Sequence, residues 1–292
     1  MYKVKDYILG YEIIVSPERA KRPTHFKEKE MGKEEIKKEI MYCPFCPGNE
    51  HLTPKEYWRI EKNNEWIIRC FPNKFKIWKW HDLIVDARDH FIDWDKNKNL
   101  ELVIHAIQKR VKELYEIKEI KYAQVFRNYG KESGASIRHS HLQIVGLDFI
   151  PEKIDEIKNK LKKCSCRICR KYKEQILIYE GDFFRVLAID GRFPYEVEIH
   201  PKEHKGFLKL NNEEIKELSK LIMLIIKKIK EYFNAYNVLF FIEPRNNDDF
   251  HFFIRIIPRI NKFGGLEFST NIFVNTISKE KTFEFYKDIF KF

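Results

Sequence analysis

Apolar residues recur at spacings of three and four along two stretches of the chain, the pattern of amphipathic helices. The apolar positions are Leu100, Val103, Ile107, Val111 and Leu114 in the first stretch, and Ile215, Leu218, Leu221, Ile222, Ile225 and Ile229 in the second. The second stretch follows Asn211 and Asn212, which are good helix caps. It opens with Glu213 and Glu214, whose charges suit the positive end of a helix dipole. The pattern therefore predicts two long helices, each with one face packed on a core.

Runs rich in β-branched and aromatic residues surround both helices and predict strands. They span residues 66–70, 83–86 and 122–127 around the first helix, and 183–189, 195–200 and 238–242 around the second. A further strand in each half is expected to begin at a histidine, His139 in one and His251 in the other. Each helix is thus expected to pack on an antiparallel sheet.

The two halves of the chain repeat one another. Each contains, in order, a Cys-x-x-Cys pair, two strands, a loop histidine, the helix, and a strand histidine. The loop and strand histidines are 49 residues apart in the first half and 47 in the second. The sequence therefore predicts a duplicated α+β unit. The expected domains are residues 1–150 and 151–292, joined near Pro151 by a Lys/Glu-rich helix over 152–163.

Each half offers four ligands of the kind that zinc prefers, two thiolates from one turn and two imidazoles. The sets are Cys43, Cys46, His90 and His139 in the first half, and Cys166, Cys169, His204 and His251 in the second. Because four protein ligands leave no open position, both sites are expected to be structural. Cys164 is an alternative ligand in the second set. Lone histidines such as His81 are interpreted as ordinary surface or core residues.

Composition narrows the class of protein. The chain has 292 residues, of which 43% are hydrophobic and 34% charged, as in globular proteins. The longest apolar run, 221–226, is too short to cross a bilayer, and the N-terminus shows no signal peptide, so a cytoplasmic protein is expected. The net charge of +11 comes with interleaved Lys and Glu and no nucleic-acid motif, so nucleic-acid binding is not favoured.

The last strand of the first half carries candidate chemistry. His139, His141 and Gln143 alternate along it, so their side chains share one face of the sheet. The loop upstream contains Asn128, Gly130, Gly134, Ala135 and Ser136, small and polar residues that suit phosphate oxygens. A neutral imidazole can attack a phosphoanhydride, whose leaving group departs as a stable anion. His141 is therefore the expected nucleophile, with Gln143 as a hydrogen-bond donor to a phosphoryl oxygen. The alternative is that both histidines are ordinary strand residues or both are ligands.

The second half lacks this chemistry although it keeps the ligand set. Phe253 stands at the place of His141, and Arg255 at the place of Gln143. One chemical centre per chain is expected.

At these residues the sequence resembles the galactose-1-phosphate uridylyltransferase family of the histidine triad superfamily, over nearly the whole chain. The similar segments are 16–23 (Ser-Pro-Glu-Arg-Ala-Lys-Arg-Pro), 43–50 (Cys-Pro-Phe-Cys-Pro-Gly-Asn-Glu), 71–75 (Phe-Pro-Asn-Lys-Phe), 128–143 and 263–267 (Phe-Gly-Gly-Leu-Glu). The resemblance implies two histidine-triad-like units, the second degenerate. It also implies a role in carbohydrate and galactose metabolism, with two structural Zn²⁺ ions.

The resemblance further implies a ping-pong reaction in which His141 takes a nucleoside monophosphate from a nucleotide sugar and passes it to a hexose 1-phosphate. The implied substrate contacts are Arg19, Arg22, Asn73, Asn128, Ser136 and Gln143. A homodimer is implied as well, in which Glu267 of one chain holds the sugar in the site of the other. Two guanidinium groups suit phosphate recognition.

Two departures from the family pattern leave the base and the acceptor open. Ser140 stands where the family usually has proline, and the second Cys-x-x-Cys resembles the related ADP-glucose phosphorylase branch. The alternative enzyme is therefore a nucleotide-sugar phosphorylase that uses inorganic phosphate. A zinc-bearing nucleotide- or nucleic-acid-binding module is the alternative outside enzymes. Dinucleotide hydrolysis is a weaker option, because Gln143 replaces the histidine expected of hydrolytic relatives.

Overall fold

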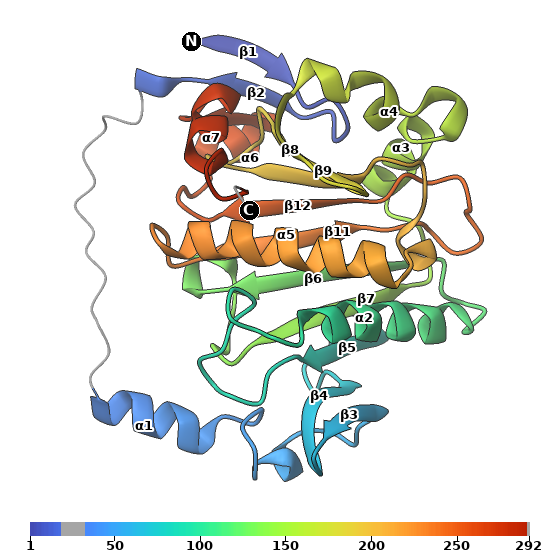
Figure 1. Ribbon diagram of the computed structural model, residues 1–292, viewed down its shortest axis with the longest axis vertical. Coiled ribbons are helices and arrows are strands. Elements are labelled where there is room, and N and C mark those ends of the chain that lie inside the picture. The colour runs from blue at the N-terminus through green and yellow to red at the C-terminus, as the bar shows by residue number, and fades with distance from the viewer. Residues whose placement is uncertain (19–32, 291–292) are drawn as a thin grey trace.

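Ten strands form one large sheet in the computed structural model, which describes residues 1–18 and 33–290 (Figure 1). In spatial order they are β3 (Trp58–Lys62), β4 (Glu65–Pro72), β5 (Trp80–Val85), β7 (His141–Leu147), β6 (Tyr122–Tyr129), β11 (Tyr236–Phe241), β12 (Phe253–Pro258), β10 (Val197–Pro201), β9 (Phe184–Ala188) and β8 (Ile176–Glu180). Every neighbouring pair is antiparallel. The predicted α+β class with antiparallel sheets and packed helices is confirmed.

The two halves share this sheet rather than each keeping its own. Strands β6 and β11 pair directly, with Tyr129 opposite Tyr236 and Asn128 opposite Asn237. The backbone ladder therefore crosses the boundary expected near Pro151. The division into domains 1–150 and 151–292 remains a prediction about folding units.

The two long helices lie side by side on one face of the sheet, as Figure 1 shows. They are α2 (Leu100–Tyr115) and α5 (Asn212–Lys230). The backbone N–H of Glu214 donates to the Asn211 side chain (3.0 Å), and Asn211 N donates to the Glu214 carboxylate (2.8 Å), so the predicted cap is present as a full capping box.

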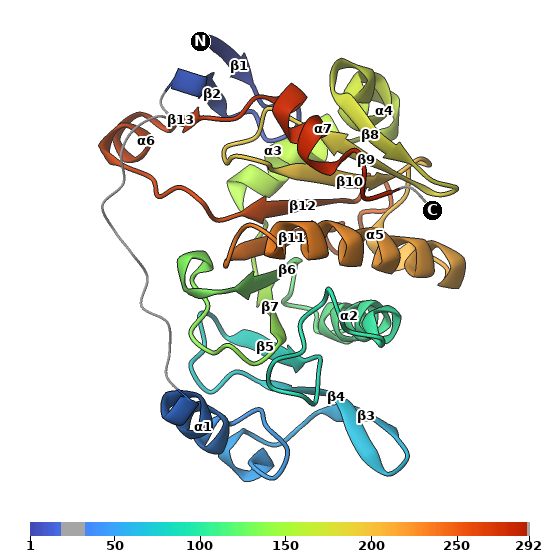
Figure 2. The same ribbon diagram turned by 60° about the vertical axis from the view of Figure 1, so that its left-hand side comes forward.

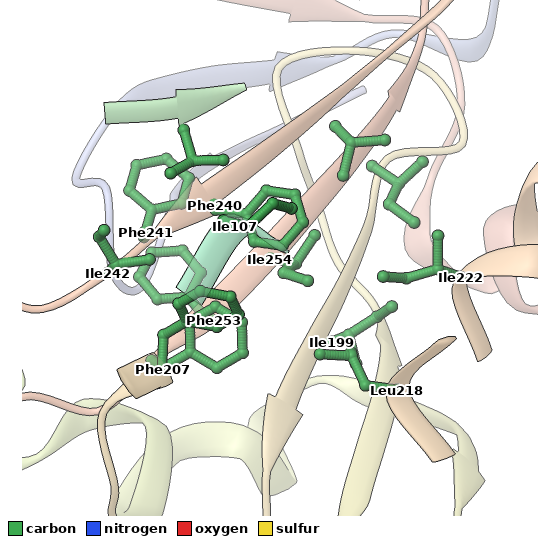
Figure 3. Packing of buried hydrophobic residues seen from close by; sticks show 14 of the residues in the cluster. Ile107, Ile199, Phe207, Leu218, Ile222, Phe240, Phe241, Ile242, Phe253 and Ile254 are labelled. Atoms are coloured by element: carbon green, nitrogen blue, oxygen red, sulfur yellow. The ribbon is translucent and has the colours of Figure 1, made fainter. Parts of the chain in front are cut away.

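The core lies between the helices and the sheet. Ile107 of α2, Phe240 of β11 and Ile254 of β12 are buried completely and gather there (Figure 3). Burying a side chain of this size contributes roughly 1.5–3 kcal/mol. The helix periodicity and the strand alternation therefore meet in one apolar layer.

A second, three-stranded sheet was not predicted from the sequence. It pairs β2 (Glu12–Val15) with β1 (Tyr2–Lys5) in antiparallel fashion and with β13 (Ile272–Asn275) in parallel, so a strand from late in the chain joins the two N-terminal strands at one end of the molecule (Figure 2). The other helices are α1 (Lys33–Tyr42), α3 (Glu152–Lys160), α4 (Arg167–Lys171), α6 (Gly265–Thr270) and α7 (Lys279–Tyr286). Short 3-10 turns span Glu50–Leu52, Lys131–Ser133, Lys163–Ser165, Tyr172–Glu174 and Phe207–Lys209.

Two predicted boundaries shift. The connecting helix expected over 152–163 ends at Lys160, and a 3-10 turn follows. The last strand of each half begins at His141 and Phe253, so His139 and His251, expected on these strands, lie two residues before them, with Nδ1 of each ring near a thiol. Among the described residues, the helices lack the length and apolar character that crossing a membrane requires.

Gly130 and Gly134, on either side of a 3-10 turn, offer a matched test of how the loop between β6 and β7 is held. Both have positive φ, 78° and 86°. A Cβ on Gly130 would lie 2.2 Å from the carbonyl oxygen of Asn234, whereas one on Gly134 would come no nearer than 3.9 Å to Asn128. We expect Gly134→Ala to cost about 1–2 kcal/mol of unfolding free energy from the left-handed backbone alone. Gly130→Ala should cost clearly more, as measured by urea denaturation, and equal losses would contradict this account.

Candidate active site

The four predicted ligands of the first half converge. Cys43, Cys46, His90 and His139 are all buried, and their ligand atoms lie within 4.8 Å of one another. Nδ1 of His139 lies 3.4 Å from the sulfur of Cys46 and 3.6 Å from that of Cys43, and Nδ1 of His90 lies 3.2 Å from Cys46. Ligands about 2.0–2.3 Å from a tetrahedral zinc lie roughly 3.5 Å apart. The donor set and its spacing therefore fit zinc.

The far nitrogen of each ring is also held as a metal ligand requires. Nε2 of His139 donates to the carbonyl oxygen of Ala87 at 2.8 Å, and Nε2 of His90 lies 3.3 Å from the carboxylate of Glu39. A proton on Nε2 leaves the lone pair on Nδ1, which faces the sulfurs. Both histidines are thus set in the tautomer that binds metal through Nδ1.

The second half repeats the arrangement in a more open form. Cys166, Cys169, His204 and His251 also place their ligand atoms within 4.8 Å of one another. Nδ1 of His251 lies 3.3 Å from Cys166 and 3.4 Å from Cys169, while its Nε2 donates to the carbonyl oxygen of Pro201 at 2.9 Å. Cys169 is exposed, and its sulfur is 4.0 Å from His204. Cys164 is exposed and is not one of the four grouped residues.

This difference predicts the order in which metal is lost. With two equivalents of zinc bound, we expect a chelator to remove the ion of the second group first, because Cys169 is exposed whereas all four residues of the first group are buried. Metal content and thermal unfolding would be followed together. Cys169→Ser should lower the zinc content by about one equivalent and eliminate the faster phase of zinc release. Cys164→Ser should change neither the zinc content nor the rate of release. Release in a single phase would contradict the expected difference.

His141 is the first residue of β7 and lies beside the first group. Its Nδ1 is 2.8 Å from the carbonyl oxygen of His139. A carbonyl can only accept, so Nδ1 carries the proton and Nε2 keeps the lone pair. Burial lowers the pKa of His141 to about 4, which keeps the ring neutral near pH 7. The ring of Phe45, from the first Cys-x-x-Cys turn, packs against the ring of His141, with the two ring centroids 5.2 Å apart. The ligand turn therefore borders the candidate nucleophile.

Two of the predicted phosphate contacts, Gln143 and Asn128, lie with His141 on one face of the sheet. Gln143 lies two residues along β7, and Phe126 pairs opposite it, which places Asn128 of β6 on the same face. Asn73 follows β4, and its backbone N–H donates to the carbonyl oxygen of His81 at 2.7 Å. Ser136 is exposed in the loop between β6 and β7.

A buried charge network supports the same strand from the helix side. One arm of the Arg127 guanidinium lies 2.9 Å from Asp86 and 3.0 Å from the carbonyl oxygen of His141, and the other lies 2.6 Å from Asp93. Ser140 donates its hydroxyl proton to Asp86 and accepts from Arg127 at 2.9 Å. The serine that departs from the family pattern thus belongs to this network, which sequence analysis did not find.

In the second half, the equivalent face of the sheet is covered by other parts of the chain. Phe253, at the place of His141, stacks on Phe241 with ring centroids 4.3 Å apart. Arg255, at the place of Gln143, is fully buried and pairs with Asp6, Glu196 and Glu198. Tyr7, Ile8 and Leu9 of the N-terminal segment are buried as well, and side chains of α3 and α4 bond their carbonyl groups. The chain's own N-terminus therefore fills this face.

A cavity of about 210 Å³ lies near this segment, lined in part by Asp6, Tyr7, Asp190 and Lys279. None of the predicted site residues lines it. Several of its polar groups already pair within the chain, such as Asp190 with Tyr2 at 2.9 Å. The candidate site is instead the face of the sheet that carries His141, Gln143 and Asn128.

Three predicted contacts are not part of this cluster as the structure describes it. Arg19 and Arg22 lie outside the described residues. Glu267 lies in α6, where its carboxylate accepts from the backbone N–H of Gly264 at 2.9 Å, and α6 packs against β13 at the end of the molecule opposite β3 (Figure 2). Its expected role in a partner's site remains a prediction.

Comparison with known proteins identifies the family. Residues 78–285 match a family described as "Domain of unknown function (DUF4921)". The chain belongs to the DUF4921 family. This DUF4921 chain is 26% identical to the ADP-glucose phosphorylase of Arabidopsis thaliana, over 98% of the chain and 92% of that protein. It is 28% identical to the galactose-1-phosphate uridylyltransferase of Thermotoga maritima, over 92% of each protein.

A solved structure agrees. The crystal structure of an ADP-glucose phosphorylase from Arabidopsis thaliana with bound ADP-glucose superposes with a TM-score of 0.87 at 25% identity, covering 98% of each chain. These comparisons confirm the resemblance to galactose-1-phosphate uridylyltransferases with features of the ADP-glucose phosphorylase branch. This DUF4921 protein is therefore similar in sequence to proteins of both names over nearly its whole length, and it shares the fold of the ADP-glucose phosphorylase.

Proposed function

We propose that this protein is a nucleotidyltransferase that uses a nucleotide sugar and forms a nucleotidyl-histidine at His141. One observation carries the proposal: the His141 ring has its proton fixed on Nδ1 by the carbonyl of His139, which leaves the Nε2 lone pair as the nucleophile. The names of the relatives support the substrate class, since one names the nucleotide sugar ADP-glucose and the other names uridylyl transfer and galactose 1-phosphate.

In the proposed first half-reaction, His141 is the nucleophile. Nε2 of His141 attacks the α-phosphorus of the nucleotide sugar, a P–N bond forms, and the bond to the bridging oxygen breaks. The sugar 1-phosphate leaves with both electrons of that bond. The amides of Gln143 and Asn128 lie on the same face as His141, where they would donate to the phosphoryl oxygens, and Ser136 and Asn73 would add contacts to the nucleotide.

Zinc ions at the two Cys/His groups would have a structural part. When bound, zinc supplies fixed geometry and folding free energy at a four-ligand site. His139 and Phe45 link the first group to the reaction, since His139 supplies the carbonyl that holds Nδ1 of His141 and Phe45 packs on its ring.

The second half-reaction returns the nucleotide to a phosphate acceptor. A phosphate oxygen attacks the phosphorus of the nucleotidyl-histidine, the P–N bond breaks, and His141 is regenerated. We propose a hexose 1-phosphate as the acceptor, which is uridylyltransferase chemistry. Inorganic phosphate is the second candidate. It is supported by the complete second Cys/His group and by the match to ADP-glucose phosphorylase over 98% of the chain.

The proposal extends to residues beyond the described cluster. Arg19 and Arg22 would contact the phosphates, and Glu267 would hold the sugar in the site of the other chain of a homodimer. Each assignment can be tested by substitution. Loss of Glu267 should raise KM for both the sugar phosphate and the nucleotide sugar, because both substrates carry the sugar that Glu267 would hold.

The test is mass spectrometry of the protein after mixing with UDP-glucose or ADP-glucose. The expected result is a covalent nucleoside monophosphate on His141, whose mass names the base. Discharge by galactose 1-phosphate but not by phosphate would establish the transferase, and the reverse would establish the phosphorylase. Absence of any adduct, together with salt-dependent polynucleotide binding, would instead support the nucleotide- or nucleic-acid-binding module.

A further inference from the structure

The amide of Gln143 is fixed by a chain of hydrogen bonds that begins at a backbone N–H. Ile77 N donates to Nδ1 of His81 at 3.0 Å, and Nε2 of His81 lies 2.9 Å from Oε1 of Gln143. A backbone N–H can only donate, so Nδ1 of His81 accepts and Nε2 carries the proton. That proton is donated to Oε1, so the NH₂ group of Gln143 points away from His81.

The amide of Asn128 is fixed in the same way from the other side. Arg259 donates from Nη1 to Oδ1 of Asn237 at 3.0 Å, and Nδ2 of Asn237 donates to Oδ1 of Asn128 at 2.7 Å. A guanidinium has no acceptor, so every bond in this chain has one possible direction. The NH₂ group of Asn128 is left on the side of Gly134, whose added Cβ would lie 3.9 Å from Nδ2 of Asn128.

Each chain of hydrogen bonds includes one diagonal step between neighbouring strands. His81 lies diagonally across from Gln143 on the β5–β7 pair, and Arg259, just beyond β12, lies diagonally across from Asn237 of β11. His81 is 1% exposed, and burial lowers its pKa, so it stays neutral. Each chain of hydrogen bonds starts at a group that can only donate, the Ile77 N–H or the Arg259 guanidinium. The amide nitrogen of Asn73 also lies 3.4 Å from Nδ1 and 3.3 Å from Nε2 of His81, farther than either Ile77 N or Gln143 Oε1. The direction of each chain is therefore set by the fold.

We propose that His81 and Arg259 are positioning residues that hold Gln143 and Asn128 with their NH₂ groups toward the ligand, so that this face accepts only a group rich in hydrogen-bond acceptors, such as a fully ionised phosphate. A flipped amide would present its carbonyl oxygen to a phosphoryl oxygen and repel it. The identity of the ligand in this inference rests on the proposed function, whereas the direction of the two series of hydrogen bonds does not.

The first test needs no turnover. Long-range ¹H–¹⁵N correlation spectra of protein labelled at histidine report which ring nitrogen carries the proton. The expected result is that His81 is protonated at Nε2 alone, and that it remains so in Gln143→Ala because Ile77 N–H fixes Nδ1 as the acceptor. A proton on Nδ1 of His81 would overturn the assignment, whatever reaction the protein catalyses.

The second test asks whether His81 acts through Gln143. The rate at which nucleotide sugar loads His141 would be measured by rapid quench and mass spectrometry in a double-mutant cycle. His81→Phe, which keeps a ring but loses both nitrogens, should slow loading about 10-fold, the scale of one hydrogen bond to a charged group. The same change in a Gln143→Ala background should slow it by less than about 2-fold. His81→Gln, which can both accept and donate, should restore most of the rate.

The Arg259 chain has an equivalent control. Arg259→Met should slow loading in the wild-type background but not in Asn128→Ala, whereas Arg259→Lys keeps a donor and should retain most of the rate. Equal effects in both backgrounds would mean a merely structural role and would overturn the proposal. If the wild-type protein formed no adduct, the proposed function would fail. The tautomer of His81 would still show whether the hydrogen bonds from Ile77 through His81 to Gln143 run in the proposed direction.

Discussion

Replacing His141 by asparagine is expected to abolish the nucleotidyl-enzyme and to lower turnover by at least about 10⁴-fold, the scale seen when a covalent nucleophile is removed. Asparagine can still donate to the carbonyl of His139 but has no nucleophilic nitrogen. Because that bond is local, the fold should survive. Adduct mass and steady-state turnover would both be measured, and the thermal midpoint would confirm folding.

The matched control is His105→Asn on α2, which lies on the helix side of the sheet and contributes nothing to the site face. It should load and turn over as the wild type does. Turnover by His141→Asn within about 10-fold of wild type would rule out covalent catalysis at this position.

The largest effect on stability is expected for Arg127→Met. Arg127 is fully buried and pairs with two buried carboxylates, Asp86 and Asp93. Removing one partner of a buried ionic group typically costs about 3–5 kcal/mol, because the remaining charge stays buried without compensation. Asp93 would keep its ion pair with Lys230 at 3.0 Å, so most of this cost is expected to come from Asp86, which would lose its only cationic partner among the ion pairs described.

Urea denaturation would measure the loss of unfolding free energy. Arg59→Met is the control, since its ion pair with Glu56 lies at the surface, where such pairs contribute about 0.2–1 kcal/mol. A loss for Arg127→Met no larger than that of the control would show that the network under β7 does not support the fold.

Periodicity predicted the parts of the fold that are both regular and buried on one side. The helices α2 and α5 and the central strands follow directly from apolar spacing. The order of the two ligand sets revealed the duplication, because cysteine and histidine at matched places are rare enough to stand out. Both sets come together in space as expected.

Other parts had no local signal. The strand β2 pairs with β13 from the other end of the chain, and no spacing within a short window reports such a contact. The direct pairing of β6 with β11 is likewise set by tertiary packing. Charged residues in strands, such as Arg127 and Arg255, were not identified as buried, because the sequence does not show which carboxylates face them.

His81 shows where strand logic could have gone further. It was interpreted as an ordinary histidine, yet it alternates with Leu83 and Val85 along β5, and these pair with Gln143 and His141. Alternation therefore places it on the face of the candidate nucleophile. Its link to Ile77 N–H, in contrast, depends on the fold of the loop after β4 and has no signature in the sequence.

The continuous ladder through β6 and β11 has a consequence for dissecting the protein. Separating the two halves would leave β6 paired only with β7, as an edge strand whose N–H and C=O groups on the side of β11 are free to pair with any extended chain. The same separation would uncover the side of α2 that packs on α5. An isolated first half would therefore tend to self-associate or aggregate, even though it contains the nucleophile and a complete ligand set.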